Sequence, residues 1–139
     1  MITLNTIIHL IKDKCKEIPN VGTIVLNDIY ELNALQNVEY STFCITQQKH
    51  SFDINTRMMH YNFIIFYVDR LTEDKKDEID VQSMGVQLLK YLVEDIEETT
   101  MIGIPSNYMF TTFTEKFQSL CAGAYVEVTF EVPEDCDEL

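Results

Sequence analysis

Apolar residues between Ile2 and Cys15 recur at steps of three and four along the first part of the chain. This spacing places them on one side of an α-helix, so the pattern predicts an amphipathic helix at the N-terminus. Thr3 or Asn5 is suited to cap its start, because a side-chain oxygen there accepts a hydrogen bond from an exposed backbone N–H group. Pro19 is expected to end the helix, since proline disfavours helical backbone in the residue before it.

A longer apolar stripe predicts a second helix in the middle of the chain, from about Asp77 to Glu97. We expect Leu88, Leu92 and Ile96 to pack on a sheet. The full stripe consists of Val81, Met84, Leu88, Leu89, Leu92, Val93 and Ile96.

Four stretches have the composition and the two-residue alternation of β-strands: residues 40–46, 60–68, 108–117 and 124–132. In the last stretch, Phe130 and the valines point one way, while Glu127 and Glu131 point the other way. Residues 60–68 are apolar on both faces, which is typical of a central strand covered from two sides.

Strands paired before and after a helix are typical of the α+β class. We therefore predict a single domain over residues 1–139, in which an antiparallel sheet of about four strands packs against the N-terminal helix and the long central helix. The length of the chain agrees with one domain. A short β-branched segment at Thr23–Leu26 precedes the strands, followed by a helix of one or two turns at 29–35 with Asn27 or Asp28 as its cap.

Residues 47–59 are polar, contain no proline or glycine, and form a segment longer than a tight hairpin requires. They predict either a long β-arm or a mobile loop, and we expect this arm to be loose in the free subunit and ordered on assembly. The acidic residues at 133–139 predict a frayed C-terminal tail.

The chain carries 10 lysines and arginines against 23 acidic residues, a formal net charge of −13 at pH 7. This balance disfavours nonspecific binding to the phosphate backbone of nucleic acids. Residues 69–98 hold ten acidic and four basic residues, and residues 131–139 hold five acidic residues and no basic one. These regions indicate either a solvated helix face with a solubilising tail, or a surface that lies near DNA and repels it.

The sequence contains no motif typical of catalysis or of metal binding. His9, His50 and His60 match no metal-ligand spacing, and we expect His9 to be partly buried and His60 to lie at a strand end. The carboxylates lie in solvated runs, where pKa values are not shifted as catalysis requires. We therefore predict no enzyme, no catalytic residue, no metal and no organic cofactor. No CxxC pair occurs among Cys15, Cys44, Cys121 and Cys136, so neither a zinc site nor a thioredoxin-like motif is indicated. Nothing else in the sequence indicates secretion, so we expect reduced thiols.

No apolar run approaches the ~18–20 residues of a membrane-spanning helix, and we predict no membrane contact. The N-terminal helix lacks the basic start and the cleavage site of a signal peptide, so we expect the mature protein to retain it.

Seven tyrosines and eight phenylalanines are concentrated in the predicted strands. Two helices cover one face of a sheet well, so aromatic residues on the other face either complete the core or contact a partner subunit. The residues that we predict at such an inter-subunit interface are Tyr67, Phe110 and Phe113.

Residues 60–97, HYNFIIFYVDRLTEDKKDEIDVQSMGVQLLKYLVEDIE, resemble the corresponding block in a family of small proteins from crAss-like phages, which are tailed phages that infect Bacteroides. The similarity lies in the apolar strand ending in YVDRL, the acidic connector and the helix start IDVQSMGVQLL. The order of elements along the whole chain is similar to that of tail-terminator and head–tail connector (neck) ring proteins.

The resemblance implies a structural virion protein, assembled in the host cytoplasm, that forms a homo-oligomeric ring in the phage neck or at the top of the tail. The ring would be sixfold or twelvefold, and its neighbours would be other neck, portal or tail-tube proteins. Genomic DNA would pass through an acidic lumen without specific binding. The arm at 47–59 would reach an adjacent subunit or ring, which adds Lys49 and Arg57 to the predicted interface; the lumen-facing carboxylates stay unassigned.

Two alternatives are compatible with the same composition. An acidic DNA mimic that occupies a host DNA-binding protein would also carry strong negative charge, although residues 1–68 have a net charge of only −1. A small enzyme of another type is the third possibility. Light scattering separates a ring former, which assembles, from a mimic, which stays monomeric or dimeric.

Overall fold

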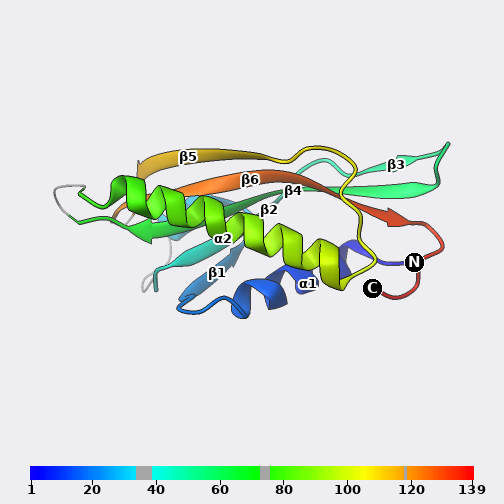
Figure 1. Cartoon of the computed structure of the whole chain (residues 1–139), viewed down its shortest axis with the longest axis horizontal. Coiled ribbons are helices and arrows are strands. Elements are labelled where there is room, and N and C mark those ends of the chain that lie inside the picture. The colour runs from blue at the N-terminus through cyan, green and yellow to red at the C-terminus, as the bar shows by residue number, and fades with distance from the viewer. Residues whose placement is uncertain (34–38, 73–75, 118) are drawn as a thin grey trace.

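The computed structural model describes residues 1–33, 39–72, 76–117 and 119–139. Within these residues the chain has an α+β fold with two α-helices, one short 3-10 helix and a six-stranded mixed sheet (Figure 1). Along the chain the elements are α1 (Leu4–Lys16), β1 (Thr23–Leu26), the 3-10 helix η1 (Ile29–Asn33), β2 (Thr42–Gln47), β3 (Ser51–Asp53), β4 (Met58–Arg70), α2 (Glu78–Thr99), β5 (Met109–Lys116) and β6 (Leu120–Pro133).

Strands β4 and β6 form the centre of the sheet. Their antiparallel ladder runs from the pair Met58 and Pro133 to the pair Arg70 and Cys121. The strand order is β1-β2-β4-β6-β5, and β3 pairs with the first residues of β4, beyond the end of β2. The predicted antiparallel pairs β2–β4 and β5–β6 are confirmed, whereas β1 lies parallel to β2.

The sheet has six strands instead of the predicted four, because two of them are too short to show a pattern. β1 has four residues and β3 has three. The segment with η1 carries the chain back along β1, so β2 runs in the same direction and the sheet is mixed rather than purely antiparallel. η1 begins where the short helix was predicted, and the Asp28 carboxylate accepts a hydrogen bond from the Tyr30 N–H at 2.8 Å. The end of that predicted helix, residues 34–35, lies outside the described residues.

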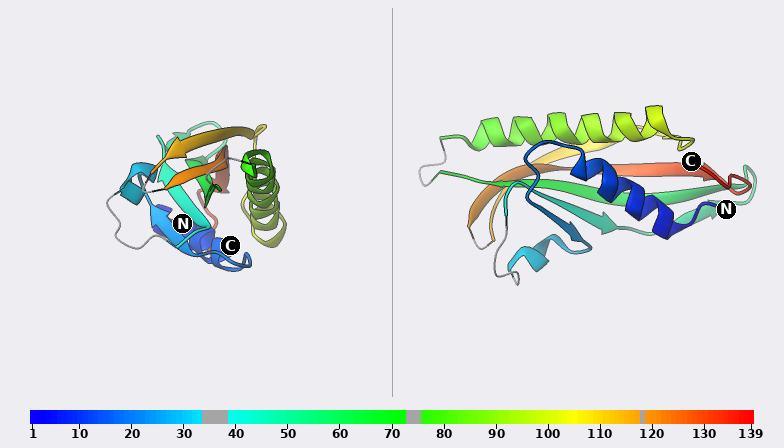
Figure 2. Two further views of the ribbon diagram at one scale, coloured as in Figure 1. Left: turned by 90° about the vertical axis from the view of Figure 1, so that its left-hand side faces the viewer. Right: turned by 90° about the horizontal axis from the view of Figure 1, so that it is seen from below.

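Both α-helices pack on the same face of the sheet and contact each other (Figures 1 and 2). α2 follows its predicted course, with Leu92 and Ile96 buried and Leu88 half-buried. α1 begins after Thr3, whose side chain accepts a hydrogen bond from the Thr6 N–H as a cap. The two apolar stripes therefore form one core with the inward side chains of β2, β4 and β6.

A second, smaller cluster lies on the opposite face of the sheet, against η1. Its buried members are Val25, Ile29, Leu32, Cys44, Val68, Phe117 and Cys121. η1 is much shorter than either α-helix, so it covers only part of this face.

The C-terminal tail is attached to the domain, contrary to the predicted fraying. The ammonium group of Met1 pairs with Asp137 at 2.8 Å, and Arg57 forms a two-pronged salt bridge with Glu134. Leu139 packs against the edge of the main core. The tail is held because the N-terminus and the arm bring positive charges beside its carboxylates.

Candidate functional site

The three aromatic residues predicted at one interface do not lie on one surface. Tyr67 is only 5% exposed and packs edge-on against Phe43 under the helices, with ring centroids 5.5 Å apart. Phe110 points to the same helix-covered face. Tyr67 pairs with Ala124 on β6 and Phe110 pairs with Val126, and these two β6 residues, two positions apart, face the same side. Phe113 points to the opposite face. The two-residue period of β4 and β5 separates them, so Tyr67 is corrected to a core residue.

The opposite face carries an aromatic cluster that the α-helices leave uncovered. Phe66, Tyr125 and Phe113 lie half-buried on β4, β6 and β5, with centroids 5.1 Å apart for Phe66 and Tyr125 and 6.0 Å apart for Phe66 and Phe113. At its edge Tyr30 of η1, 58% exposed, packs on Phe117 at 6.0 Å. We call these five side chains the aromatic face.

Two shallow cavities flank Phe66 on the aromatic face, with volumes of about 330 Å³ and about 140 Å³. The first is also lined by Ile64 and Thr46, and the second by Tyr30 and Phe113. The sequence predicted Phe113 as an interface residue but did not indicate Phe66 or Tyr125. Only the register of β4 with β6, which places the Phe66 and Tyr125 rings opposite each other, identifies these two.

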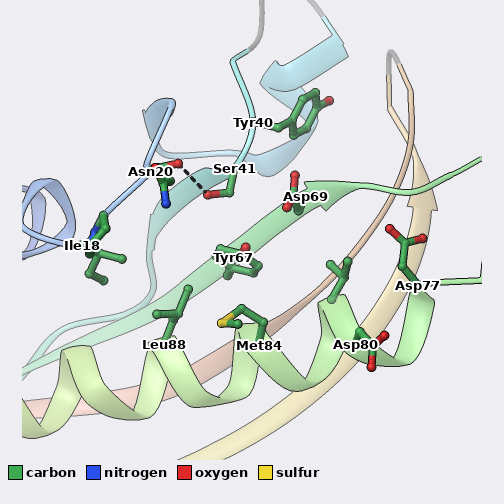
Figure 3. A pocket seen from close by; sticks show the side chains of 12 residues that line it. Ile18, Asn20, Tyr40, Ser41, Tyr67, Asp69, Asp77, Asp80, Met84 and Leu88 are labelled. Carbon is green, nitrogen blue, oxygen red and sulfur yellow. Dashed lines mark hydrogen bonds between the residues drawn. The ribbon is translucent and has the colours of Figure 1, made fainter.

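A larger cavity of about 650 Å³ lies on the other side of the sheet, beside the N-terminal half of α2 (Figure 3). We call it the acidic groove. Its lining residues are Ile18, Pro19, Asn20, Tyr40, Ser41, Tyr67, Asp69, Asp77, Asp80, Val81, Met84 and Leu88. Figure 3 shows the three aspartates toward the start of α2, with Leu88 and Ile18 farther along the groove.

The three carboxylates of the acidic groove are placed by their own elements. Asp77 precedes the first turn of α2 and accepts hydrogen bonds from the N–H and the hydroxyl of Thr72. Asp80 lies in that first turn, where the partial positive charge of the helix N-terminus stabilises a carboxylate. Asp69 accepts the Arg70 N–H at 2.8 Å. None of the three forms a salt bridge within the described residues, so the groove keeps its negative charge.

Two tyrosines that line the groove have raised pKa values. Burial raises the pKa of Tyr67, and the nearby Asp69 carboxylate raises it further. Burial also raises the pKa of Tyr40, which lies close to the Cys121 thiol. Both phenols therefore stay neutral at physiological pH, and the aspartates determine the charge of the groove.

The arm at 47–59 forms a β-hairpin, which is the β-arm alternative of the sequence prediction. β3 pairs with β4, and the turn between them is closed by Asp53, whose carboxylate accepts the N–H groups of Asn55 and Thr56. Arg57 lies 4.9 Å from the Phe52 ring and reaches Glu134. Lys49 is exposed, and its carbonyl accepts a hydrogen bond from the Asn62 side chain.

We expect trypsin to cut slowly after Arg57 in the isolated protein, because the Arg57 N–H and carbonyl bond to Asp53 and to the Glu134 N–H. Glu134→Ala removes the ion pair and should speed this cut by about two- to fivefold, the effect of an exposed salt bridge. Glu138→Ala, on the same tail, is the control and should leave the rate unchanged. Equal rates for both variants by mass spectrometry would contradict this assignment.

His50 closes the gap between β2 and β3. Its Nδ1 atom accepts the Asn62 N–H at 3.1 Å, which leaves the ring proton on Nε2, facing the Gln47 side-chain oxygen at 3.2 Å. The ring also packs on Tyr61 and Phe63. Burial lowers the pKa of His50 from its ordinary value of 6.5, and protonation would cost the hydrogen bond at Nδ1.

The unfolded chain therefore takes up a second proton on the His50 ring more readily than the folded protein does. We expect the His50 contribution to stability to be complete above about pH 6.5 and to be lost as the pH falls below that value. His50→Asn keeps an acceptor near the Nδ1 position without titrating. Urea unfolding at about pH 5 and pH 7.5 should show a smaller loss on acidification for this variant than for the wild type. An unchanged loss would exclude His50 as the titrating group.

The other histidines and the cysteines form no common site among the described residues. His9 is exposed rather than partly buried, and His60 pairs with Glu131 across β4 and β6 at 2.8 Å. None of the four cysteines, all of which the structure describes, forms a disulfide, and burial raises the pKa of Cys15 to about 12. Among the described residues, no group of three or more histidine, cysteine or acidic side chains is arranged to hold a metal ion. The same residues contain no helix long and apolar enough to span a membrane.

The fold and these surfaces define the chain as an acidic α+β domain with an aromatic face, an acidic groove and a projecting hairpin. Comparison with protein-family models and with curated proteins finds no match for the chain.

Proposed function

We propose that the protein is a structural subunit of a tailed phage of the crAss-like type, with a tail-terminator-like fold. In this proposal, copies of the chain form a ring in the neck or at the top of the tail, where the ring connects the head to the tail or terminates the tail. It contacts portal, neck or tail-tube proteins, and genomic DNA passes through the lumen. The resemblance of residues 60–97 to phage proteins motivates the proposal.

The observation that carries the proposal is the aromatic face. Phe66, Phe113 and Tyr125 form a continuous cluster across three neighbouring strands, and neither of the two described α-helices covers them. Aromatic side chains contribute much of the binding energy of protein interfaces, and an uncovered aromatic cluster beside shallow cavities is typical of an interaction surface.

The charge of the chain supports passage of DNA without capture. Asp80, Glu97 and Glu98 are exposed along α2, and the tail adds further carboxylates. A wall of this kind repels phosphate and gains no counterion release from it. We expect the free subunit not to bind duplex DNA at about 0.15 M salt, where charges are screened over ~8 Å.

The direct test is to find the protein in purified virions by mass spectrometry and to measure the mass of the isolated protein by light scattering. We expect it in mature particles, and we expect added salt to promote ring formation, since salt screens repulsion between subunits. Absence from particles, or tight duplex binding, would overturn the proposal. A monomer or dimer that occupies a host DNA-binding protein would indicate the DNA mimic instead.

Variants of the aromatic face test the role of this surface. Phe113→Asp and the more exposed Tyr30→Asp should prevent ring formation while circular dichroism remains native. Thr112→Asp is the matched control, because Thr112 is exposed and is the β5 neighbour of Phe113 that points to the opposite face. Rings that form equally well in all three variants would exclude the aromatic face from the interface.

A further inference from the structure

The tip of the β3–β4 hairpin presents an exposed aliphatic side chain on an ordered turn. Ile54 is 75% exposed. The turn that holds it is closed by hydrogen bonds to Asp53 from Asn55, Thr56 and Arg57. Because this backbone is already ordered, burying Ile54 against a partner costs little additional conformational entropy.

The acidic groove lies at the other end of the molecule. Figure 1 shows the β3–β4 hairpin and the start of α2 at opposite ends of the longest axis. Inside the groove Met84 is 46% exposed and Leu88 is half-buried, so an apolar strip is open to a partner (Figure 3). The volume of about 650 Å³ exceeds what one aliphatic side chain fills.

The charges of the two ends are complementary. The groove carries Asp69, Asp77 and Asp80, and none of the described residues that line it is basic. The arm at 47–59 contains Lys49 and Arg57 against one acid, Asp53, in a chain with a net charge of −13. Arg57 is shared with Glu134, so Lys49 is the arm cation that forms no salt bridge within the described residues.

We propose that the hairpin tip of one copy docks into the acidic groove of the next, with Ile54 on Met84 and Leu88 and with Lys49 toward the aspartates. The inference rests on the proposed ring assembly and identifies one of its contacts. Because the two surfaces lie at opposite ends of the folded molecule, the contact is head-to-tail and repeats from copy to copy, as a ring requires.

The test places the photoreactive amino acid p-benzoylphenylalanine at position 54, in a mixture of isotopically heavy and light protein. Irradiation should join two different copies, and mass spectrometry should locate the adduct on the Val81–Leu88 stretch of α2. The matched control carries the probe at position 101, because Met101 is similarly exposed, at 67%, outside both surfaces. This control should not label that stretch.

Two substitutions give an independent measurement. Ile54→Asp and Met84→Asp should each weaken association by about 10- to 100-fold in concentration-dependent light scattering. This is the effect of losing the burial of one apolar side chain at the contact. Met101→Asp should leave association unchanged. A ring in which position 54 labels another surface overturns this contact and leaves the ring proposal standing. A protein that remains monomeric and gives no adduct between copies overturns this contact, and its absence from purified virions as well would overturn the ring proposal.

Discussion

Leu92→Asp is expected to prevent the chain from folding. Leu92 is 1% exposed and lies between α2 and the sheet in the main core. Removing a buried leucine side chain costs about 2–5 kcal/mol, and an aspartate in its place adds an unpaired carboxylate in an apolar site. Such a loss is comparable with the whole stability of an ordinary domain, about 5–15 kcal/mol.

The neighbouring residue supplies the control for this substitution. Tyr91 lies on the same helix and is 58% exposed, so Tyr91→Asp should change the free energy of unfolding by no more than about 0.5 kcal/mol. Circular dichroism and urea unfolding of both variants check the expectation. A soluble Leu92→Asp protein with native stability would refute the packing of α2 on the sheet.

The second large effect is expected from the smallest possible addition to the core. Gly123 lies on β6 beside Val68 of β4, and a Cβ atom there would be 1.8 Å from the Tyr67 carbonyl oxygen and 3.2 Å from the Phe113 ring. Backbone atoms at the centre of a sheet move only together with the strands. We therefore expect Gly123→Ala to cost about 3 kcal/mol or more, at the upper end of overpacking effects.

Gly103→Ala is the same substitution at a position with space. Its Cβ would meet only the Glu131 carbonyl oxygen, at 3.9 Å, which is an ordinary contact. We expect its melting temperature to stay close to that of the wild type and that of Gly123→Ala to fall by about 10 °C or more. Equal melting temperatures would show that β4 and β6 are farther apart at Gly123 than described.

Residues that repeat with a period were predictable from the sequence. The stripe that includes Leu92 and Ile96 identified α2, and the alternation of residues 124–132 identified β6 and its inward face. Such patterns are visible because each element must bury one side of itself. β1 and β3 lacked this signal, since backbone pairing with longer neighbours holds such short strands.

Gly85 shows how tertiary packing reverses a local preference. A glycine in the middle of a helix is less favourable than alanine by about 1 kcal/mol, so the sequence alone counts it against α2. In the fold, a Cβ at this position would lie 3.0 Å from the Tyr67 ring and 3.2 Å from Ala124. The glycine lets α2 approach β4 and β6 closely.

The sequence by itself determined the α+β class, both long helices, the two main strand pairs and the acidic character of the surface. These properties depend on the spacing and number of residue types along the chain. The tertiary structure alone decided which aromatic residues form one face, that the arm is an ordered hairpin, and that Asp69, Asp80 and Ile18 line one groove. Those properties depend on strand register and on contacts between segments far apart in the chain, which no local pattern encodes.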